Sequence, residues 1–165
     1  MENNEVEMPI TGHLNELRKR VTWIFIFVMI TAVVAFAFNR QLIAMLLMPF
    51  PEGVEIVQIG VTEGLGVSMK VAIVAGLFVA FPVISFQAIM FINPALEKKE
   101  KRYVYYSMPI VFALFFLGIS FSFFLLLPFM MKFLPTFLGD LVTPQISVRS
   151  VVGTTLWLMF VMGFI

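Results

Sequence analysis

The stretch HLNELRKRVTWIFIFVMITAVVAFAF, residues 13–38, joins a charged cluster to an apolar run. Three bases and one carboxylate stand directly before the 18 residues from Val21 to Phe38, which carry no charge. A helix needs roughly 20 apolar residues to cross the hydrocarbon core of a bilayer. The stretch therefore predicts a transmembrane helix with a basic collar at its N-terminal end. It leaves the single acid of that collar, Glu16, to be explained.

The remainder of the chain is also strongly apolar. Hydrophobic residues make up 61% of the 165-residue sequence and charged residues 13%, whereas a soluble domain has about 25% charged residues. Further apolar blocks cover residues 71–92, 103–127 and 151–165. The first three blocks are long enough to cross a membrane, and we interpret the fourth as a truncated span. We therefore predict an all-α membrane protein, a polytopic helical bundle in a single membrane domain.

The first apolar block, 21–38, is interpreted as a permanent span rather than a signal peptide. It is longer than a typical h-region, and no Ala-x-Ala-like site follows it. Its orientation follows from lysine and arginine, which are enriched in cytoplasmic loops. Seven of these bases fall in segments 1–20 and 93–102, against four in segments 39–70 and 128–150. The sequence therefore predicts a cytoplasmic N-terminus and two outer loops.

The outer loops are long enough to hold structure of their own. The apolar segment Leu42–Met48 is too short to span a membrane and precedes Pro49 and Pro51, so we expect an interfacial helix there. The partial alternation in VEIVQIGV, residues 54–61, predicts a short strand. The prolines of segment 128–150 favour one short helix within irregular chain.

The sequence carries none of the motifs of common catalytic and metal sites. It has no cysteine, and its one histidine, His13, forms H-x-x-E with Glu16 rather than the H-E-x-x-H zinc pattern. No histidine lies within the apolar blocks to activate a serine there, and no phosphate-binding loop is present. We predict a protein that is not an enzyme, with no metal, no cofactor and no nucleic-acid partner.

Polar and proline residues in and beside the apolar blocks are candidates for structural or partner contacts. Gln87 lies in the second block, and we expect it to hydrogen-bond another helix. Pro82 removes a backbone donor and is expected to kink the same helix, as Pro109 is in the third block. Such kinks permit a concave bundle but also occur in helices with no special role, so both interpretations stay open. Pro49 in the first outer loop is a further candidate.

The acids Glu16 and Glu100 both lie within basic clusters. On a helix that starts near Thr11, Glu16 stands four residues before Arg20 and can pair with it. On charge pattern alone, both acids only reduce the positive charge of the two collars.

The segment NPALEKKEKR, residues 93–102, has the character of a helix start. Asn93 is suited to the N-cap and Pro94 to the first helical position. Glu97 and Lys101 then form a favourable pair four residues apart.

Two predicted cytoplasmic motifs resemble those of the TatC family, the multispanning receptor subunit of the twin-arginine protein translocase. HLNELRKR matches the family signature H-L-x-E-L-R-x-R, and AFPVISFQAIMFINPALEKKEKR, residues 80–102, is similar to its second span and first cytoplasmic loop. Weaker likenesses occur at MPF (48–50), VTEGL (61–65) and LLPF (126–129). The sequence departs from the family pattern at Phe86 and Met90, where Tyr and Trp are commoner, and it stops in the fourth of the family's six spans.

The resemblance implies a receptor that binds twin-arginine signal peptides of folded proteins at the cytoplasmic face and nucleates the translocon with TatA- and TatB-like single-span partners. Membrane lipid and further copies of the receptor are the other implied partners, and the bacterial cytoplasmic (inner) membrane is the implied location. By motif position, Glu16, Arg18 and Glu100 match signal-recognition residues, and Phe91 and Pro94 flank that surface.

Carboxylates suit this role because arginine forms directional, charge-assisted forks with them. The seven surrounding bases would nevertheless repel a cationic peptide at long range. We therefore expect Glu16 and Glu100 to converge while the bases face lipid phosphates. Two other classes stay open: a secondary transporter, which would need polar groups near the bilayer midplane, and a structural assembly subunit of a membrane complex.

Overall fold

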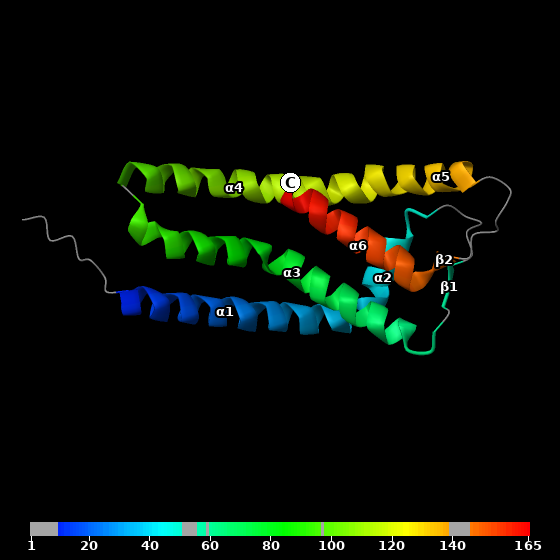
Figure 1. Cartoon of the computed structure of the whole chain (residues 1–165), viewed down its shortest axis with the longest axis horizontal. Coiled ribbons are helices and arrows are strands. Elements are labelled where there is room, and N and C mark those ends of the chain that lie inside the picture. Colours follow the sequence, from blue (N-terminus) through cyan, green and yellow to red (C-terminus); the bar gives the residue numbers. More distant parts are fainter. Residues whose placement is uncertain (1–9, 51–55, 59, 97, 139–145) are drawn as a thin grey trace, which may run out of the picture.

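The computed structural model describes residues 10–50, 56–58, 60–96, 98–138 and 146–165. Its elements are, in chain order, α1 (Ile10–Ala37), α2 (Asn39–Leu47), β1 (Ile56–Val57), α3 (Glu63–Ile92), the 3-10 turn η1 (Asn93–Ala95), α4 (Lys98–Phe121), the π-helical turn η2 (Ser122–Leu126), α5 (Leu127–Leu138), β2 (Ile146–Ser147) and α6 (Val148–Phe164). Figure 1 shows α1, α3 and α4 running along the molecule, with α6 crossing between α3 and α4. The predicted all-α bundle is confirmed.

Within the described chain, three helical segments are long and apolar enough to cross a membrane: Leu14–Ala37, Glu63–Ile92 and Lys99–Phe133. Helix α6 has 17 residues and is apolar but shorter. The apolar blocks of the sequence fall within helices except for the end residues Phe38 and Ile165. The helices extend beyond the blocks because long charged side chains at a membrane surface can keep their heads in water while the backbone stays helical.

Small residues set how closely the long helices approach one another. A Cβ atom on Gly76 of α3 would lie 2.7 Å from the Cα of Ala32 on α1, and the Thr31 hydroxyl donates to the Gly76 carbonyl at 3.0 Å. Elsewhere, a side chain at Gly118 of α4 would overlap the carbonyl oxygen of Met162 in α6. Such close backbone approach favours association in lipid, where burial of apolar surface between helices gives little advantage.

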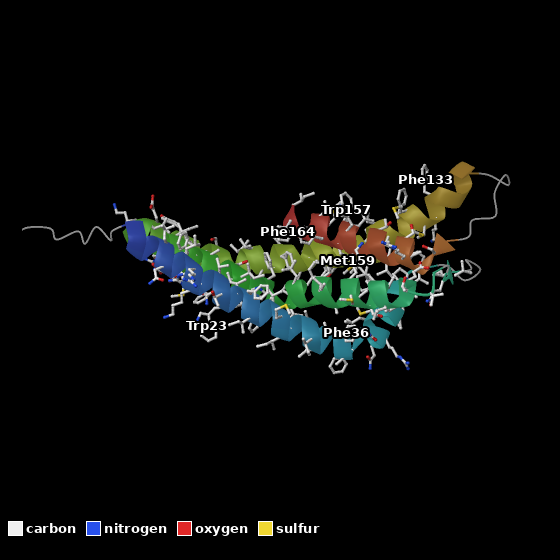
Figure 2. The ribbon with its side chains drawn as sticks, turned by 60° about the horizontal axis from the view of Figure 1, so that its bottom comes forward. Trp23, Phe36, Phe133, Trp157, Met159 and Phe164 are labelled. Atoms are coloured by element: carbon white, nitrogen blue, oxygen red, sulfur yellow. The ribbon has the colours of Figure 1, made fainter. Side chains whose placement is uncertain are left out.

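The buried core lies toward the end of the bundle that holds α2. It consists of Leu46, Val67, Val71, Phe123, Val152 and Leu156. In a separate aromatic group, Phe81 stacks on Phe115 with ring centroids 3.7 Å apart, and Phe164 meets both rings edge-on. Most large side chains of α1 are exposed, and Figure 2 shows Trp23 on the outer side of that helix. An exposed apolar surface of this kind fits contact with lipid.

The two predicted outer loops meet in a parallel pair of strands. β1 and β2 have two residues each, and Ile56 lies opposite Ile146. Helix α2 is the helix expected at Leu42–Met48, although it starts earlier, at Asn39. Helix α5 is the short helix expected in segment 128–150. The pairing joins loops that are far apart in the sequence, and no local pattern predicts it.

The expected helix start at Asn93 is wrong. Asn93–Ala95 forms a 3-10 turn that follows α3 directly, and Leu96 then has extended backbone angles (φ −92°, ψ 142°). An extended residue interrupts helical hydrogen bonding, so α4 begins only at Lys98. The predicted pair of Glu97 lies outside the described residues.

Proline does not end either long helix. Pro82 lies inside α3 and Pro109 inside α4. Figure 1 shows α3 changing direction along its length, whereas α4 runs nearly straight. The regular helix following Pro109 is instead interrupted at Ser122–Leu126 by the π-helical turn. The Ser122 hydroxyl in this turn is buried without a hydrogen-bond partner among the described residues.

Candidate functional site

A polar cluster joins α1 and α3 near the start of α1. Arg20 donates from Nε to Oε1 of Glu16 at 3.0 Å and from Nη2 to the same oxygen at 2.5 Å. Its third donor, Nη1, reaches Oε1 of Gln87 on α3 at 3.1 Å. The structure therefore contains the expected pair of Glu16 with Arg20, and it gives Gln87 a hydrogen bond to another helix.

Among the described residues, the hydrogen bonds to Glu16 reach only one of its two carboxylate oxygens. The side chains of Arg20 and Glu16 are 19% and 25% exposed, so their attraction is less weakened by water than at an open surface. Nε and Nη2 of Arg20 both donate to Oε1 of Glu16, and Oε2 accepts no hydrogen bond from the described residues. Glu16 can therefore accept a further donor without losing its contact with Arg20.

Glu100 lies in the first turn of α4, where the helix dipole favours a carboxylate, and it is exposed. The N-terminal ends of α1 and α4 lie at the same end of the molecule, with the C-terminal end of α3 between them (Figure 1). The structure thus brings Glu16 and Glu100 to one end, on helices that α3 separates. Phe91 is half-buried in the last turn of α3, and Pro94 is exposed in the η1 turn between α3 and α4.

Arg18 has different surroundings from Glu16. Its side chain is exposed and lines a shallow hollow of about 310 Å³ on α1, together with Asn15, Lys19, Thr22 and Trp23. Glu16 and Arg20 do not line this hollow. The structure therefore separates two of the residues that the sequence motif had grouped together.

The remaining predicted contacts lie away from this end. Pro49 is half-buried in the turn after α2, and Pro82 is half-buried inside α3. Neither lines a described cavity. Among the described residues, no three His, Asp or Glu side chains gather as metal ligands.

Sequence reasoning missed the buried carboxylate Glu63, which is 9% exposed. Its Oε2 accepts from the Gly60 amide at 3.0 Å and its Oε1 from the Arg149 amide at 2.9 Å. It thereby links the N-terminal ends of α3 and α6, where a negative charge is favourable. A polar cavity of about 550 Å³ beside it also includes Lys70. The VTEGL likeness contained Glu63 but did not indicate this contact.

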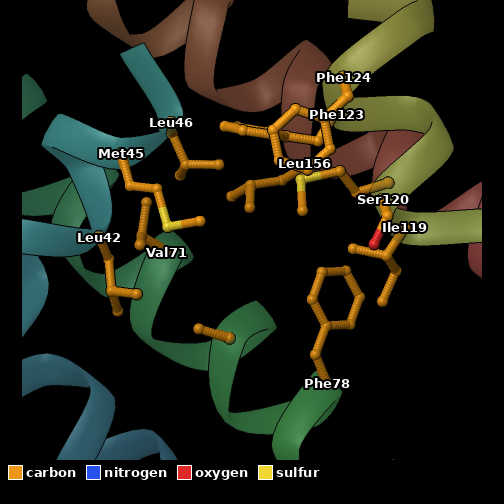
Figure 3. A pocket seen from close by; sticks show the side chains of 12 residues that line it. Leu42, Met45, Leu46, Val71, Phe78, Ile119, Ser120, Phe123, Phe124 and Leu156 are labelled. Carbon is orange, nitrogen blue, oxygen red and sulfur yellow. The ribbon is translucent and has the colours of Figure 1, made fainter. Parts of the chain in front are cut away.

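An apolar hollow of about 180 Å³ lies between α2, α3, the α4–η2 segment and α6. Figure 3 shows Leu42, Met45, Phe78 and Phe124 among its lining side chains. The Ser120 hydroxyl at its edge donates to the Phe116 carbonyl. The lining therefore offers dispersion contacts rather than hydrogen bonds to an occupant.

Comparison with known proteins decides the family. The profile of the Sec-independent protein translocase protein (TatC) matches residues 12–165. The chain belongs to the TatC family. The resemblance seen in its motifs is thereby confirmed. TatC is a translocase family of integral membrane proteins rather than an enzyme family, and the predictions of membrane integration and of no enzymatic activity agree with this.

Individual relatives support the assignment over nearly the whole chain. The chain is 36% identical to the TatC protein of Aquifex aeolicus, covering 94% of this chain and 67% of the relative. It is 31% identical to that of Desulforapulum autotrophicum, covering 100% of this chain and 63% of the relative. A crystal structure of the twin arginine translocase receptor TatC matches with a TM-score of 0.81 at 34% identity, covering 92% of this chain and 70% of that chain. The chain spans slightly less than two thirds of the length of several TatC relatives.

Proposed function

We propose that this TatC-family chain binds the twin-arginine signal peptides of folded proteins at the cytoplasmic end of the bundle. The observation that carries the proposal is the state of Glu16. Arg20 holds its carboxylate by one oxygen, and Oε2 accepts no hydrogen bond from the described residues; the start of α4, where Glu100 lies, is at the same end of the molecule. A pair of arginines is bound best by carboxylates, which accept charge-assisted hydrogen bonds from guanidinium groups.

The geometry suits guanidinium groups. One arginine of the signal peptide donates to Oε2 of Glu16, and the other is held by Glu100. Charge-assisted bonds of this type are short and directional, and arginine forms them better than lysine because its donors have a fixed planar arrangement. Arg20 already shows that a guanidinium can bind Glu16 in this position.

Phe91 and Pro94 flank the surface in this proposal. Phe91 lies in the last turn of α3 and Pro94 in the η1 turn that follows it, and this end of α3 lies between the helices that carry the two acids. We assign Arg18 a place at the edge of this surface and no direct contact with the arginine pair. A cation does not attract arginines, and Glu16 does not line the hollow that Arg18 lines.

The proposal includes a membrane topology and partners. We place the N-terminus and segment 93–102 in the cytoplasm, with segments 39–70 and 128–150 on the outer side of a bacterial cytoplasmic membrane. The charge distribution supports this orientation. Single-span TatA- and TatB-like subunits and further receptor copies are the proposed partners in a translocon nucleated by the receptor.

Site-specific photocrosslinking tests the proposal. A photoreactive amino acid is placed at Pro94 or Lys99, near the proposed surface, or at Val61, which is 99% exposed and stands before the other end of α3. In membrane vesicles, a twin-arginine peptide should crosslink at the first two positions and not at Val61. A peptide with two lysines in place of the arginines should not crosslink above background. Equal capture of both peptides at all three positions would contradict the proposal.

A further inference from the structure

The basic collar of α1 is divided between two settings. Arg20 is bound to Glu16 and Gln87 at the α1–α3 contact. Arg18 and Lys19 are exposed, and neither makes an ion pair with a carboxylate among the described residues. The charge of Arg20 is therefore balanced within the protein, whereas Arg18 and Lys19 have no carboxylate partner among the described residues and can bind an external anion.

The hollow beside these two bases has a polar end and a less polar end. Asn15, Arg18 and Lys19 supply donors at its polar end, and Thr22 and Trp23 continue it into the apolar run. The Thr22 hydroxyl donates to the Arg18 carbonyl at 2.8 Å, so that its proton is already used. Trp23 is 59% exposed and lies on the outer side of α1 (Figure 2).

This arrangement matches the order of groups in a phospholipid. The hollow begins where the membrane-length segment Leu14–Ala37 begins, which is the depth of lipid headgroups. Cationic side chains at that depth bind phosphate, and an indole there packs against the glycerol and upper acyl region while its N–H stays in a polar layer. A soluble phosphate would use the bases but would gain nothing from Trp23.

We propose that the hollow formed by Asn15, Arg18, Lys19, Thr22 and Trp23 binds the headgroup of an anionic phospholipid. Arg18 and Lys19 hold the phosphate, and Trp23 packs against the lipid below it. The bound phosphate balances the charge that would otherwise repel a cationic peptide approaching the same end of the molecule. The lipid site itself does not depend on peptide binding and stands or falls separately from the proposed function.

Tryptophan fluorescence tests the site directly. The chain has two tryptophans, so Trp157→Phe leaves Trp23 as the only reporter. This chain is reconstituted in phosphatidylcholine vesicles that contain brominated phosphatidylglycerol or, in parallel, brominated phosphatidylcholine. Each base at a membrane surface contributes about a fivefold preference for anionic lipid. With two bases the preference is about 25-fold, so brominated phosphatidylglycerol should quench Trp23 at about 25-fold lower mole fraction than brominated phosphatidylcholine.

Matched variants separate the site from general surface charge. Arg18→Gln with Lys19→Gln should abolish the preference, whereas Arg18→Lys with Lys19→Arg should keep it. Lys99→Gln with Arg102→Gln removes the same charge from exposed positions of α4 and should leave quenching of Trp23 unchanged. Equal quenching by the two lipids in the parent chain, or equal loss in both Gln pairs, would overturn the proposal.

Two further measurements remove the remaining ambiguities. Inorganic phosphate at tens of millimolar should not relieve quenching, and relief would assign the hollow to a free anion instead of a lipid. Native mass spectrometry of the unaltered chain, released from detergent with a mixture of both lipids, should show phosphatidylglycerol retained preferentially. Retention of both lipids in proportion to their supply would contradict the site without relying on the tryptophan variant.

Discussion

At the scale of single residues, Arg20 determines what Glu16 can do. It occupies one carboxylate oxygen and is itself tied to Gln87 of the neighbouring helix. An arginine can do this because its planar donors serve both acceptors at once, whereas an ammonium group has a different geometry. We therefore regard Arg20 as the residue that positions Glu16 for an incoming guanidinium, and not as a competitor for it.

Arg20→Lys should weaken binding of a twin-arginine peptide by about tenfold, which corresponds to roughly 1.4 kcal/mol, because an ammonium group cannot hold Glu16 and Gln87 at once and Glu16 is then no longer positioned for the peptide. Gln87→Leu should act in the same direction with a smaller effect, since Arg20 still reaches Glu16. Peptide affinity is measured in vesicles beside the amount of membrane-inserted protein. Tighter binding by Arg20→Lys would show that Arg20 competes with the peptide.

At the scale of helices, the close approach of α4 and α6 depends on the missing side chain of Gly118. Gly118→Ala should destabilise the chain by about 1–3 kcal/mol because the overlap with the Met162 carbonyl forces the helices apart. Gly66→Ala is the matched control, because a Cβ there meets nothing within 4 Å and alanine favours a helix by up to about 1 kcal/mol. Thermal unfolding in detergent compares the two, and equal midpoints would count against the packing described.

The long helices could be predicted from the sequence, but several contacts between distant segments could not. Uncharged runs predicted the long helices because apolar length is a local property of the chain. The start of α4 was misjudged because an N-cap pattern at Asn93 also suits the 3-10 turn that is present. The β1–β2 pairing and the contacts of Glu63 were missed, because they join segments far apart; the Arg149 amide is 86 residues from Glu63. Of the candidate site, the Glu16–Arg20 pair was predictable from spacing, whereas the separate setting of Arg18 was not.

At the scale of the whole molecule, we expect opposite ends of the bundle to face opposite sides of the membrane. The chain has no cysteine, so single cysteines can be introduced at Val61 and at Lys99 without background. An impermeant thiol reagent should label these two positions from opposite sides of sealed vesicles, because α3 lies between them and is long enough to cross the bilayer. Labelling of both from the same side would refute the orientation and the placement of the acids.

The most direct measurement of the central claim is the affinity of a twin-arginine peptide for the parent chain and for the variant with Glu16→Gln and Glu100→Gln. The variant keeps the shape and the basic collars but removes both negative charges. We predict that the parent prefers the twin-arginine peptide to its twin-lysine form and that the double variant loses about tenfold or more in affinity for the former. Unchanged affinity and preference in the variant, at equal protein abundance, would contradict the claim that these two carboxylates hold the arginine pair.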